Sequence, residues 1–194
     1  MREALIKGAK SDEWYTPMET VRTMLKVFPP PDNAHILLPY DTKKSNFTKV
    51  ITKEYDPKAI YGITDFLTKD YTFDYLITNP PYSNKDEIIK RCIDSGKPCV
   101  LVLPIESLGG VKRHAVFKKT NISIYVPTKR IKFISETGDA SKAPAHHSII
   151  MLINSVSTEI IFEHQLDLRW IIRRTIFMPK TTLHTGSNEH KIIR

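Results

Sequence analysis

The stretch that decides the fold reads Phe73-Asp74-Tyr75-Leu76-Ile77-Thr78-Asn79-Pro80-Pro81-Tyr82-Ser83. Its positions 75–78 are apolar or β-branched in succession, which predicts a short strand covered on both faces. A polar asparagine, two prolines with a restricted φ angle and an aromatic residue follow at once. The sequence therefore predicts a buried strand that ends in a rigid, polar loop.

Similar short runs recur along the chain, and segments with helical periodicity separate several of them. The helical segments cover 19–27, where Thr16-Pro17 is expected to cap the first turn, and 85–94. Strands that alternate with helices indicate an α/β fold with a mostly parallel central sheet. The short polar connection 154–157 predicts that the last two strands form an antiparallel C-terminal hairpin at the sheet edge. The predicted strands are 35–38, 59–61, 75–78, 100–103, 122–126, 148–153 and 159–162.

Composition limits the class of protein and of partner. The chain has 194 residues, of which 41% are hydrophobic, as in a globular protein. No apolar run approaches the roughly 18 residues of a membrane span, and the first twelve residues contain no apolar leader. With only two cysteines, these features predict a cytoplasmic protein. The net charge of +8 favours a polyanionic partner such as nucleic acid.

The loop after the strand 75–78 suits the methylation of an amino group on a planar ring. Such an amine is a poor nucleophile because its lone pair is delocalised into the ring. The side-chain oxygen of Asn79 and the backbone carbonyl of Pro80 can accept its two N–H groups and so free the lone pair. Tyr82 can stack on a base that has been flipped out of a duplex. In isolation, the same residues also fit a rigid turn followed by Ser83.

Asn79-Pro80-Pro81-Tyr82 after an apolar strand resembles the catalytic motif of DNA methyltransferases that act on adenine N6 or cytosine N4. The segment 12–17, Asp-Glu-Trp-Tyr-Thr-Pro, resembles the N-terminal cofactor segment of the small phage-type adenine branch of this family. The resemblance implies a Rossmann-like methyltransferase fold, S-adenosylmethionine as cofactor and the four motif residues as the catalytic loop. Open α/β sheets bind ligands beyond the carboxyl ends of their strands, which agrees with the place of this loop.

The same resemblance implies a set of cofactor contacts. Tyr15, Thr16 and Pro17 are expected at the amino-acid end of the cofactor, together with Asn79. Pro39-Tyr40-Asp41 stands where the family has a glycine-rich cofactor loop, but no glycine lies between positions 39 and 47. Asp41 is expected to meet the methionine ammonium, and Ser45-Asn46 to cap the next helix.

Three further segments are assigned less sharply. The resemblance places Asp65 and Phe66 at the cofactor's adenine ring, although Asp65 also fits a turn. The segment 129–133, Lys-Arg-Ile-Lys-Phe, resembles the target-base segment of the phage-type branch. The resemblance implies that Phe133 stacks on the flipped base and that Lys129, Arg130 and Lys132 contact phosphates. A solvated, positively charged strand edge fits these residues equally well. The basic stretch 165–194, with Arg173 and Arg174, is predicted to contact DNA or to form a homodimer. His146-His147 lacks a spaced third ligand, so no metal is expected.

The leading hypothesis is S-adenosylmethionine-dependent methylation of adenine N6 in DNA, in a bacterium or a phage-infected host. A catalytic domain would span 1–164, followed by the basic extension 165–194. RNA and protein amides are alternative targets, because planar amides need the same pair of acceptors. A methyltransferase-like binding or inhibitor protein is the third hypothesis. The glycine-free loop and the lack of an acidic residue directly after Tyr61 favour it.

Overall fold

The computed structural model describes residues 15–135 and 146–165, and within them six strands and four α-helices. Three short 3₁₀ turns connect or follow these elements. The helices are α1 (Met18–Val27), α2 (Asn46–Glu54), α3 (Lys85–Ser95) and α4 (Val111–Phe117). The strands are β1 (Ile36–Leu37), β2 (Tyr75–Thr78), β3 (Cys99–Pro104), β4 (Ile122–Val126), β5 (Ser148–Ile153) and β6 (Glu159–Phe162), and the turns are η1 (Tyr82–Asn84), η2 (Ile105–Leu108) and η3 (Glu163–Gln165).

The six strands form one sheet in the order β1-β2-β3-β5-β4-β6. The pairs β1–β2, β2–β3 and β4–β6 are parallel, whereas β5 is antiparallel to both of its neighbours. Five strands therefore run in one direction and β5 runs against them. This confirms the predicted α/β fold with a mostly parallel sheet.

The predicted C-terminal hairpin is wrong in one respect. The strands β5 and β6 do run in opposite directions, but β4 lies between them and pairs with both. The burial of the two strands explains the arrangement, because β5 is covered on both faces whereas two residues of β6 are exposed. A strand that is buried on both faces lies in the interior of a sheet, whereas a strand with one exposed face can form its edge.

The predicted strand 59–61 is reduced to a single bridge. Ile60 pairs with Leu37 of β1 in the parallel sense, and its backbone N–H and C=O bond to Ile36 and Leu38 at 2.9 and 2.8 Å. This contact holds the long connection between α2 and β2 against the edge of the sheet. The loop after β1 is thereby supported from outside.

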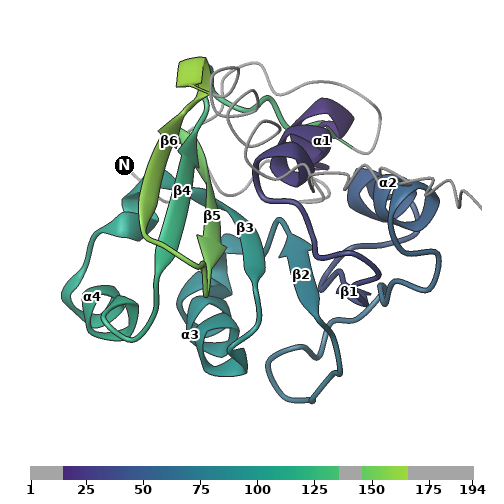
Figure 1. The fold of residues 1–194 in the computed structure, drawn as a ribbon, viewed down its shortest axis with the longest axis horizontal. Coiled ribbons are helices and arrows are strands. Elements are labelled where there is room, and N and C mark those ends of the chain that lie inside the picture. Colours follow the sequence, from purple (N-terminus) through teal and green to yellow (C-terminus); the bar gives the residue numbers. More distant parts are fainter. Residues whose placement is uncertain (1–14, 136–145, 166–194) are drawn as a thin grey trace, which may run out of the picture.

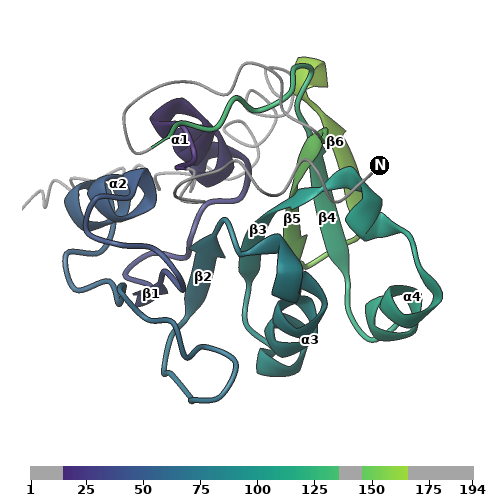
Figure 2. The same cartoon turned by 180° about the vertical axis from the view of Figure 1, so that it is seen from behind.

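Alternating side chains of the strands divide the core into two layers. Ile36, Tyr75 and Val100 face α1 and α2, whereas Leu37, Leu76 and Leu101 face α3. Figures 1 and 2 show α1 and α2 together beside β1 and β2, and α3 and α4 together across the sheet from them.

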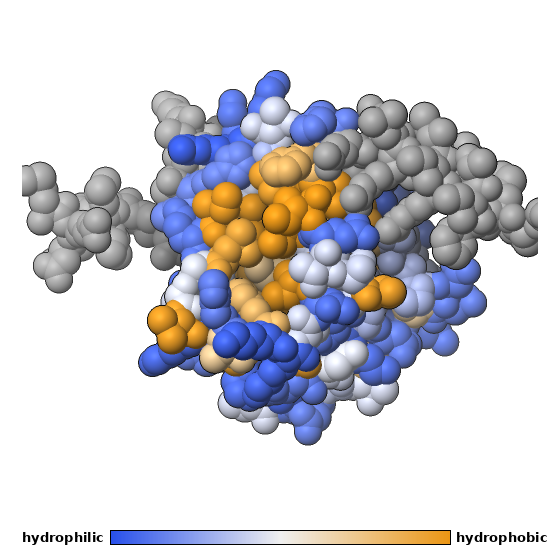
Figure 3. Space-filling view, turned by 60° about the vertical axis from the view of Figure 1, so that its left-hand side comes forward, coloured by the Kyte–Doolittle hydropathy of each residue, from blue (hydrophilic) through white to orange (hydrophobic). Residues whose placement is uncertain are grey.

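The strand β6 forms one edge of the described sheet and carries an apolar strip. Ile160 and Phe162 are 57% and 45% exposed. They lie in register with Ile124 and Val126 of β4, so the four side chains share a face. Figure 3 turns this side of the molecule towards the reader, and hydrophobic residues gather there at the surface. The strip lies on the face of the sheet that packs against α3.

Of the two predicted helix caps, the one at the start of α2 is confirmed and the one at the start of α1 is wrong. Ser45 caps α2 as predicted, because its side chain accepts a hydrogen bond from Phe47 N at 3.1 Å. Thr16 does not cap α1: Pro17 is the cap residue and makes no side-chain hydrogen bond there. The Thr16 hydroxyl is instead buried without a partner in the described residues. Proline at the cap leaves Thr16 one position too early to reach the first turn.

Candidate active site

A cavity of about 590 Å³ opens at the carboxyl ends of β1 and β2. Its wall combines five parts of the chain: the segment before α1, the loop after β1, the start of α2, the loop after β2 and the segment after β4. The lining residues are Tyr15, Thr16, Tyr40, Asp41, Thr42, Ser45, Phe47, Asn79, Pro80, Pro81, Tyr82 and Phe133.

The cavity brings together nine of the eighteen residues that the sequence assigns to a site. Tyr15, Thr16, Tyr40, Asp41 and the whole motif 79–82 line it, as does Phe133. Thr42, Ser45 and Phe47 line it as well and were not predicted as contacts. They belong to the glycine-free loop and to the start of the helix that follows it. The sequence had indicated this helix start through the predicted cap at Ser45. Other predicted residues are not among the lining residues: Pro17, Pro39, Asp65, Phe66, Lys129, Arg130 and Lys132.

The N-terminal wall is fixed by backbone hydrogen bonds between distant segments. Tyr15 pairs with Ile134 in an antiparallel bridge, with N···O distances of 2.7 and 2.8 Å. The Asn46 side chain donates to the Thr16 carbonyl at 2.9 Å. These contacts place the Tyr15–Thr16 segment between the start of α2 and the segment that carries Phe133. Residues 12–14 of the same predicted motif lie outside the described ranges.

The loop after β1 makes its turn without glycine. Tyr40 adopts a φ angle of +67°, in the left-handed region that non-glycine residues rarely occupy. Its N–H donates to Ile63 O at 2.9 Å, and the next carbonyl, of Asp41, accepts from Gly62 N at 2.7 Å. Such backbone strain persists only where the surroundings hold it, and it is concentrated at functional sites. The Tyr40 hydroxyl is buried and has no partner in the described part of the chain.

Asp41 is a buried carboxyl on the cavity wall. Ser45 Oγ donates to its Oδ1 at 2.5 Å, and Thr78 Oγ1 lies 2.8 Å from its Oδ2. Burial raises the pKa of Asp41 from 3.8 to about 7, against the opposing effect of these two hydroxyls. The described lining residues include no Lys, Arg or His that could pair with it.

The loop after β2 presents the motif 79–82. Asn79 Oδ1 is buried at the cavity and has no hydrogen-bond partner within 15–135 and 146–165. The turn behind it is closed by a hydrogen bond from Asn84 N to Pro81 O at 3.2 Å. Burial raises the pKa of the Tyr82 hydroxyl, and the Ser148 side chain acts in the opposite direction. The loop therefore offers an unpaired acceptor beside an aromatic ring.

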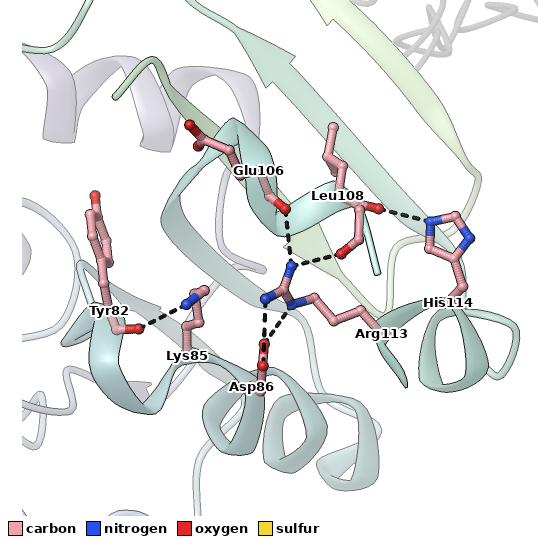
Figure 4. A network of polar contacts seen from close by, with 8 residues as sticks. Tyr82, Lys85, Asp86, Glu106, Leu108, Arg113 and His114 are labelled. Atoms are coloured by element: carbon pink, nitrogen blue, oxygen red, sulfur yellow. Dashed lines mark hydrogen bonds and ion pairs between the residues drawn. The ribbon is translucent and has the colours of Figure 1, made fainter. Parts of the chain in front are cut away.

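A network around Arg113 supports this loop from behind (Figure 4). Its guanidinium bonds to Asp86 Oδ1 at 2.5 Å, in the first turn of α3, and to the carbonyls of Glu106 and Gly109 at 3.0 and 2.6 Å. Beside it, Lys85 Nζ donates to Tyr82 O at 3.1 Å. Hydrogen bonding to Arg113 lowers the pKa of Asp86. The loop after β3 is thus tied to α3, the helix that begins next to the motif 79–82.

The segment 129–133 separates two cavities. Phe133 faces the cavity just described, whereas Lys129, Arg130 and Lys132 line a second one of about 570 Å³ between this segment and α1. Acidic residues also line the second cavity, namely Glu19 and Glu163. The structure thus places the aromatic residue of the predicted target-base segment apart from its basic residues. Arg173 and Arg174, with the rest of 166–194, lie outside the described residues.

Asp65 and Phe66 make contacts within the fold and are not among the residues that line the cavity. Phe66 is 2% exposed and packs in the α3 layer, edge-on to the Tyr40 ring at 6.4 Å between centroids. The Asp65 side chain accepts a hydrogen bond from the Tyr71 hydroxyl at 2.5 Å, and its carbonyl closes a turn. Tyr40, not Phe66, is therefore the aromatic residue of this pair that reaches the cavity.

The two adjacent histidines have separate partners. His146 Nδ1 lies 3.0 Å from Glu106 Oε1, and His147 Nε2 lies 2.9 Å from Pro127 O. The residues that the structure describes contain no group of three or more His, Cys, Asp or Glu side chains arranged to hold a metal ion. None of the helices in these ranges has the length and hydrophobicity that crossing a membrane requires.

No protein-family model matches this chain, and no curated protein matches its sequence. Solved structures are similar. A Listeria monocytogenes protein described as a class I S-adenosylmethionine-dependent methyltransferase aligns over 87% of this chain and 73% of its own, with 15% identity and a TM-score of 0.54. A Plasmodium falciparum dimethyladenosine transferase aligns over 73% and 62%, with 11% identity and a TM-score of 0.46. A Pyrococcus furiosus methyltransferase aligns over 76% and 88%, with 13% identity and a TM-score of 0.40. The likeness to the Listeria protein shows that this chain has the Rossmann-like fold of a class I methyltransferase.

Proposed function

We propose that this chain transfers a methyl group from S-adenosylmethionine to the N6 amino group of adenine in DNA. The observation that carries the proposal is Asn79 Oδ1, a buried acceptor that lacks a donor among the described residues and belongs to a residue that lines a ligand-sized cavity. Buried polar atoms are nearly always hydrogen-bonded, so an unpaired acceptor in a cavity indicates the place of a ligand donor. An exocyclic amine is such a donor.

The cavity fits the proposed cofactor in size and chemistry. Its volume of about 590 Å³ lies within the usual range for sites of small-molecule ligands. Besides Asn79, two lining residues carry buried polar atoms that lack partners among the described residues, Thr16 Oγ1 and Tyr40 Oη. Asp41 adds a carboxyl that has no cationic partner among the described residues of the wall. S-adenosylmethionine carries an ammonium, a sulfonium and two ribose hydroxyls, which match this set of groups.

The residues of the motif would activate the target amine. Asn79 Oδ1 and the Pro80 carbonyl accept its two N–H groups, and this draws the nitrogen towards a geometry in which its lone pair is free. The prolines hold both acceptors in place, so little reorganisation accompanies the reaction. Tyr82 and Phe133 border the same cavity and offer aromatic faces for a flipped base. When bound, the cofactor supplies an electrophilic methyl group.

Charge supports nucleic acid over a protein amide as the target. The chain carries a net charge of +8, and three basic residues of the segment 129–133 line the cavity next to the active site. Phosphate contacts from such residues position a strand, while the base is read in the catalytic cavity. The resemblance of the motif to the adenine branch favours DNA over RNA.

The alternative of a binding protein that has lost the cofactor is less well supported. That hypothesis rests on the glycine-free loop, because glycine allows a backbone to approach a ligand closely. Here Tyr40 adopts the left-handed conformation itself, and the loop leaves a cavity with unpaired polar atoms. A site that had lost its ligand would be expected to fill or to pair these atoms.

Two measurements test the proposal in sequence. Calorimetric titration with S-adenosylmethionine should give saturable binding, and no binding at millimolar ligand would refute the enzyme hypothesis. Transfer of a tritiated methyl group should then label duplex DNA in preference to RNA and to protein. Equal or stronger labelling of RNA or protein would contradict the assigned substrate but leave the cofactor in place.

A further inference from the structure

The short contacts around the buried carboxyl of Asp41 can all be hydrogen bonds in only one of its protonation states. The Thr78 hydroxyl lies 2.5 Å from Pro39 O and 2.8 Å from Asp41 Oδ2, and both of these atoms are acceptors when Asp41 is ionised. One hydroxyl has one hydrogen and can donate to only one of them. If Asp41 carries a proton on Oδ2, it donates to Thr78, and Thr78 donates to Pro39. Every short contact is then a hydrogen bond.

The surroundings of Asp41 also disfavour a lone charge. Asp41 is only 9% exposed, and Ser45 and Thr78, which face it from the start of α2 and from β2, are neutral. Among the described residues, the other titratable groups on the cavity wall are three tyrosines: Tyr15, Tyr40 and Tyr82. Transfer of a carboxylate into such surroundings without a cation is costly. The raised pKa of Asp41, about 7, agrees with this geometry.

We infer that Asp41 makes the cavity selective for a cationic ligand and exchanges one proton for it. The ligand-free site holds Asp41 neutral, hydrogen-bonded through Thr78 to Pro39. Arrival of an ammonium group turns Asp41 into a carboxylate, its proton leaves to solvent, and the Thr78 hydrogen becomes free to turn towards Oδ2. One proton is released for each ligand bound. The inference rests on the proposed cofactor, whose amino-acid end carries such an ammonium.

The exchange predicts a pH dependence with a definite sign. Below about pH 7 the free site must lose a proton to bind the cation, so the association constant should rise with pH. Between pH 5 and 6.5 the expected rise is about tenfold per pH unit, and it should level off above pH 7. A neutral ligand that fills the same cavity should show no such dependence.

The test is calorimetry with two probes at pH 6. S-adenosylhomocysteine keeps the ammonium, and 5′-methylthioadenosine lacks the amino-acid end. Titrations in two buffers of different ionisation enthalpy should show nearly one proton released with the first probe and none with the second. Flat affinity and no proton release with S-adenosylhomocysteine would overturn the inference while leaving the cofactor proposal intact. Failure of both probes to bind would overturn both.

Two variants separate proton exchange from a loss of folding. Asp41→Asn should bind 5′-methylthioadenosine as the unmodified chain does, but should bind S-adenosylhomocysteine more weakly and without proton release. Thr78→Val keeps the carboxyl and removes the hydroxyl that lies 2.8 Å from its Oδ2. It should still release a proton when S-adenosylhomocysteine binds. Proton release that persists in Asp41→Asn would assign the exchange to another group and contradict the inference.

Discussion

The loops after β1 and β2 line the same cavity but are stabilised in different ways. The loop after β1 depends on a buried carboxyl, two hydroxyls and a tyrosine with a positive φ angle. The loop after β2 depends on two prolines and on the partly exposed ion pair of Arg113 with Asp86 behind it. The first loop carries the buried carboxyl of Asp41, and the second carries a neutral acceptor that has no partner among the described residues.

This difference separates two tasks. A site that must hold a cationic cofactor needs a negative group that can be neutral while the site is empty. A site that activates an amine needs acceptors whose position does not change, because reorganisation during the reaction lowers the rate. The comparison supports the proposal that the loop after β1 holds the cofactor and that the loop after β2 binds the target amine. If the two loops are independent, a substitution in one of them should leave the function of the other unchanged.

The largest expected effect is on the stability of the ligand-free chain through Asp41. Its folded-state pKa of about 7 exceeds 3.8, so the folded state binds the proton more tightly and loses stability as the pH rises between these values. Relative to Asp41→Asn, the free energy of unfolding should fall by up to about 4 kcal/mol over that range. Chemical denaturation at a series of pH values measures this. Parallel curves for the two proteins would contradict the neutral buried carboxyl.

The next effect is on catalysis through Asn79. Replacing it with alanine removes one of two acceptors for the target amine, and kcat should fall by about 10²- to 10³-fold. Binding of S-adenosylhomocysteine should change by no more than a few-fold, because Asp41 and the loop after β1 are untouched. Asn84→Ala is the matched control: it is exposed and makes no side-chain cap hydrogen bond. Activity retained in Asn79→Ala would remove the motif from the mechanism.

A smaller effect should follow from the support behind the motif. Arg113→Ala breaks the link between Asp86 and the loop after β3, so kcat should fall by about tenfold while the dissociation constant of the cofactor analogue stays constant. Arg113→Lys should restore little, since one ammonium cannot reproduce the branched contacts of a guanidinium. Lys112→Ala, at an exposed neighbouring position, should behave as the unmodified chain. Equal losses in kcat and cofactor affinity would show that the two loops are not independent.

The smallest effect concerns the basic residues beside Phe133. Lys129→Ala and Lys132→Ala should each weaken DNA binding and reduce the slope of log K against log salt concentration by about one, with kcat at saturating DNA unchanged. Lys53→Ala, on an exposed position of α2 that lines neither cavity, is the control. An unchanged slope in both variants would show that these residues are only a solvated edge.

Local patterns in the sequence predicted the strands and the motif loop well. The strands at 75–78, 122–126, 148–153 and 159–162 have the predicted bounds, because apolar runs between polar turns mark them directly. The position of β5 between β3 and β4 could not be read in this way. Strand order depends on which faces are covered after folding, and the short connection 154–157 indicated a hairpin instead.

In the site too, contiguous residues could be predicted from the sequence, whereas contacts between residues far apart in the chain could not. Asn79-Pro80-Pro81-Tyr82 is contiguous and was recognised as a unit. The hydrogen bond of Thr78 to Asp41 joins residues 37 positions apart, and that of Arg113 to Asp86 joins residues 27 apart. Pattern reading also placed Phe66 at the cofactor, although its side chain is buried in the core behind Tyr40. Burial and long-range pairing, which decide these cases, are not visible in a single sequence.

Analysis of the methylated product tests the central claim most directly. Duplex DNA is incubated with the protein and S-adenosylmethionine, digested to nucleosides and examined by mass spectrometry, with Asn79→Ala in parallel. The account predicts N6-methyladenosine as the 2′-deoxynucleoside with the unmodified chain, and a loss of about 10²- to 10³-fold in the variant. A methyl group on any atom other than adenine N6, or equal product from both proteins, would contradict it.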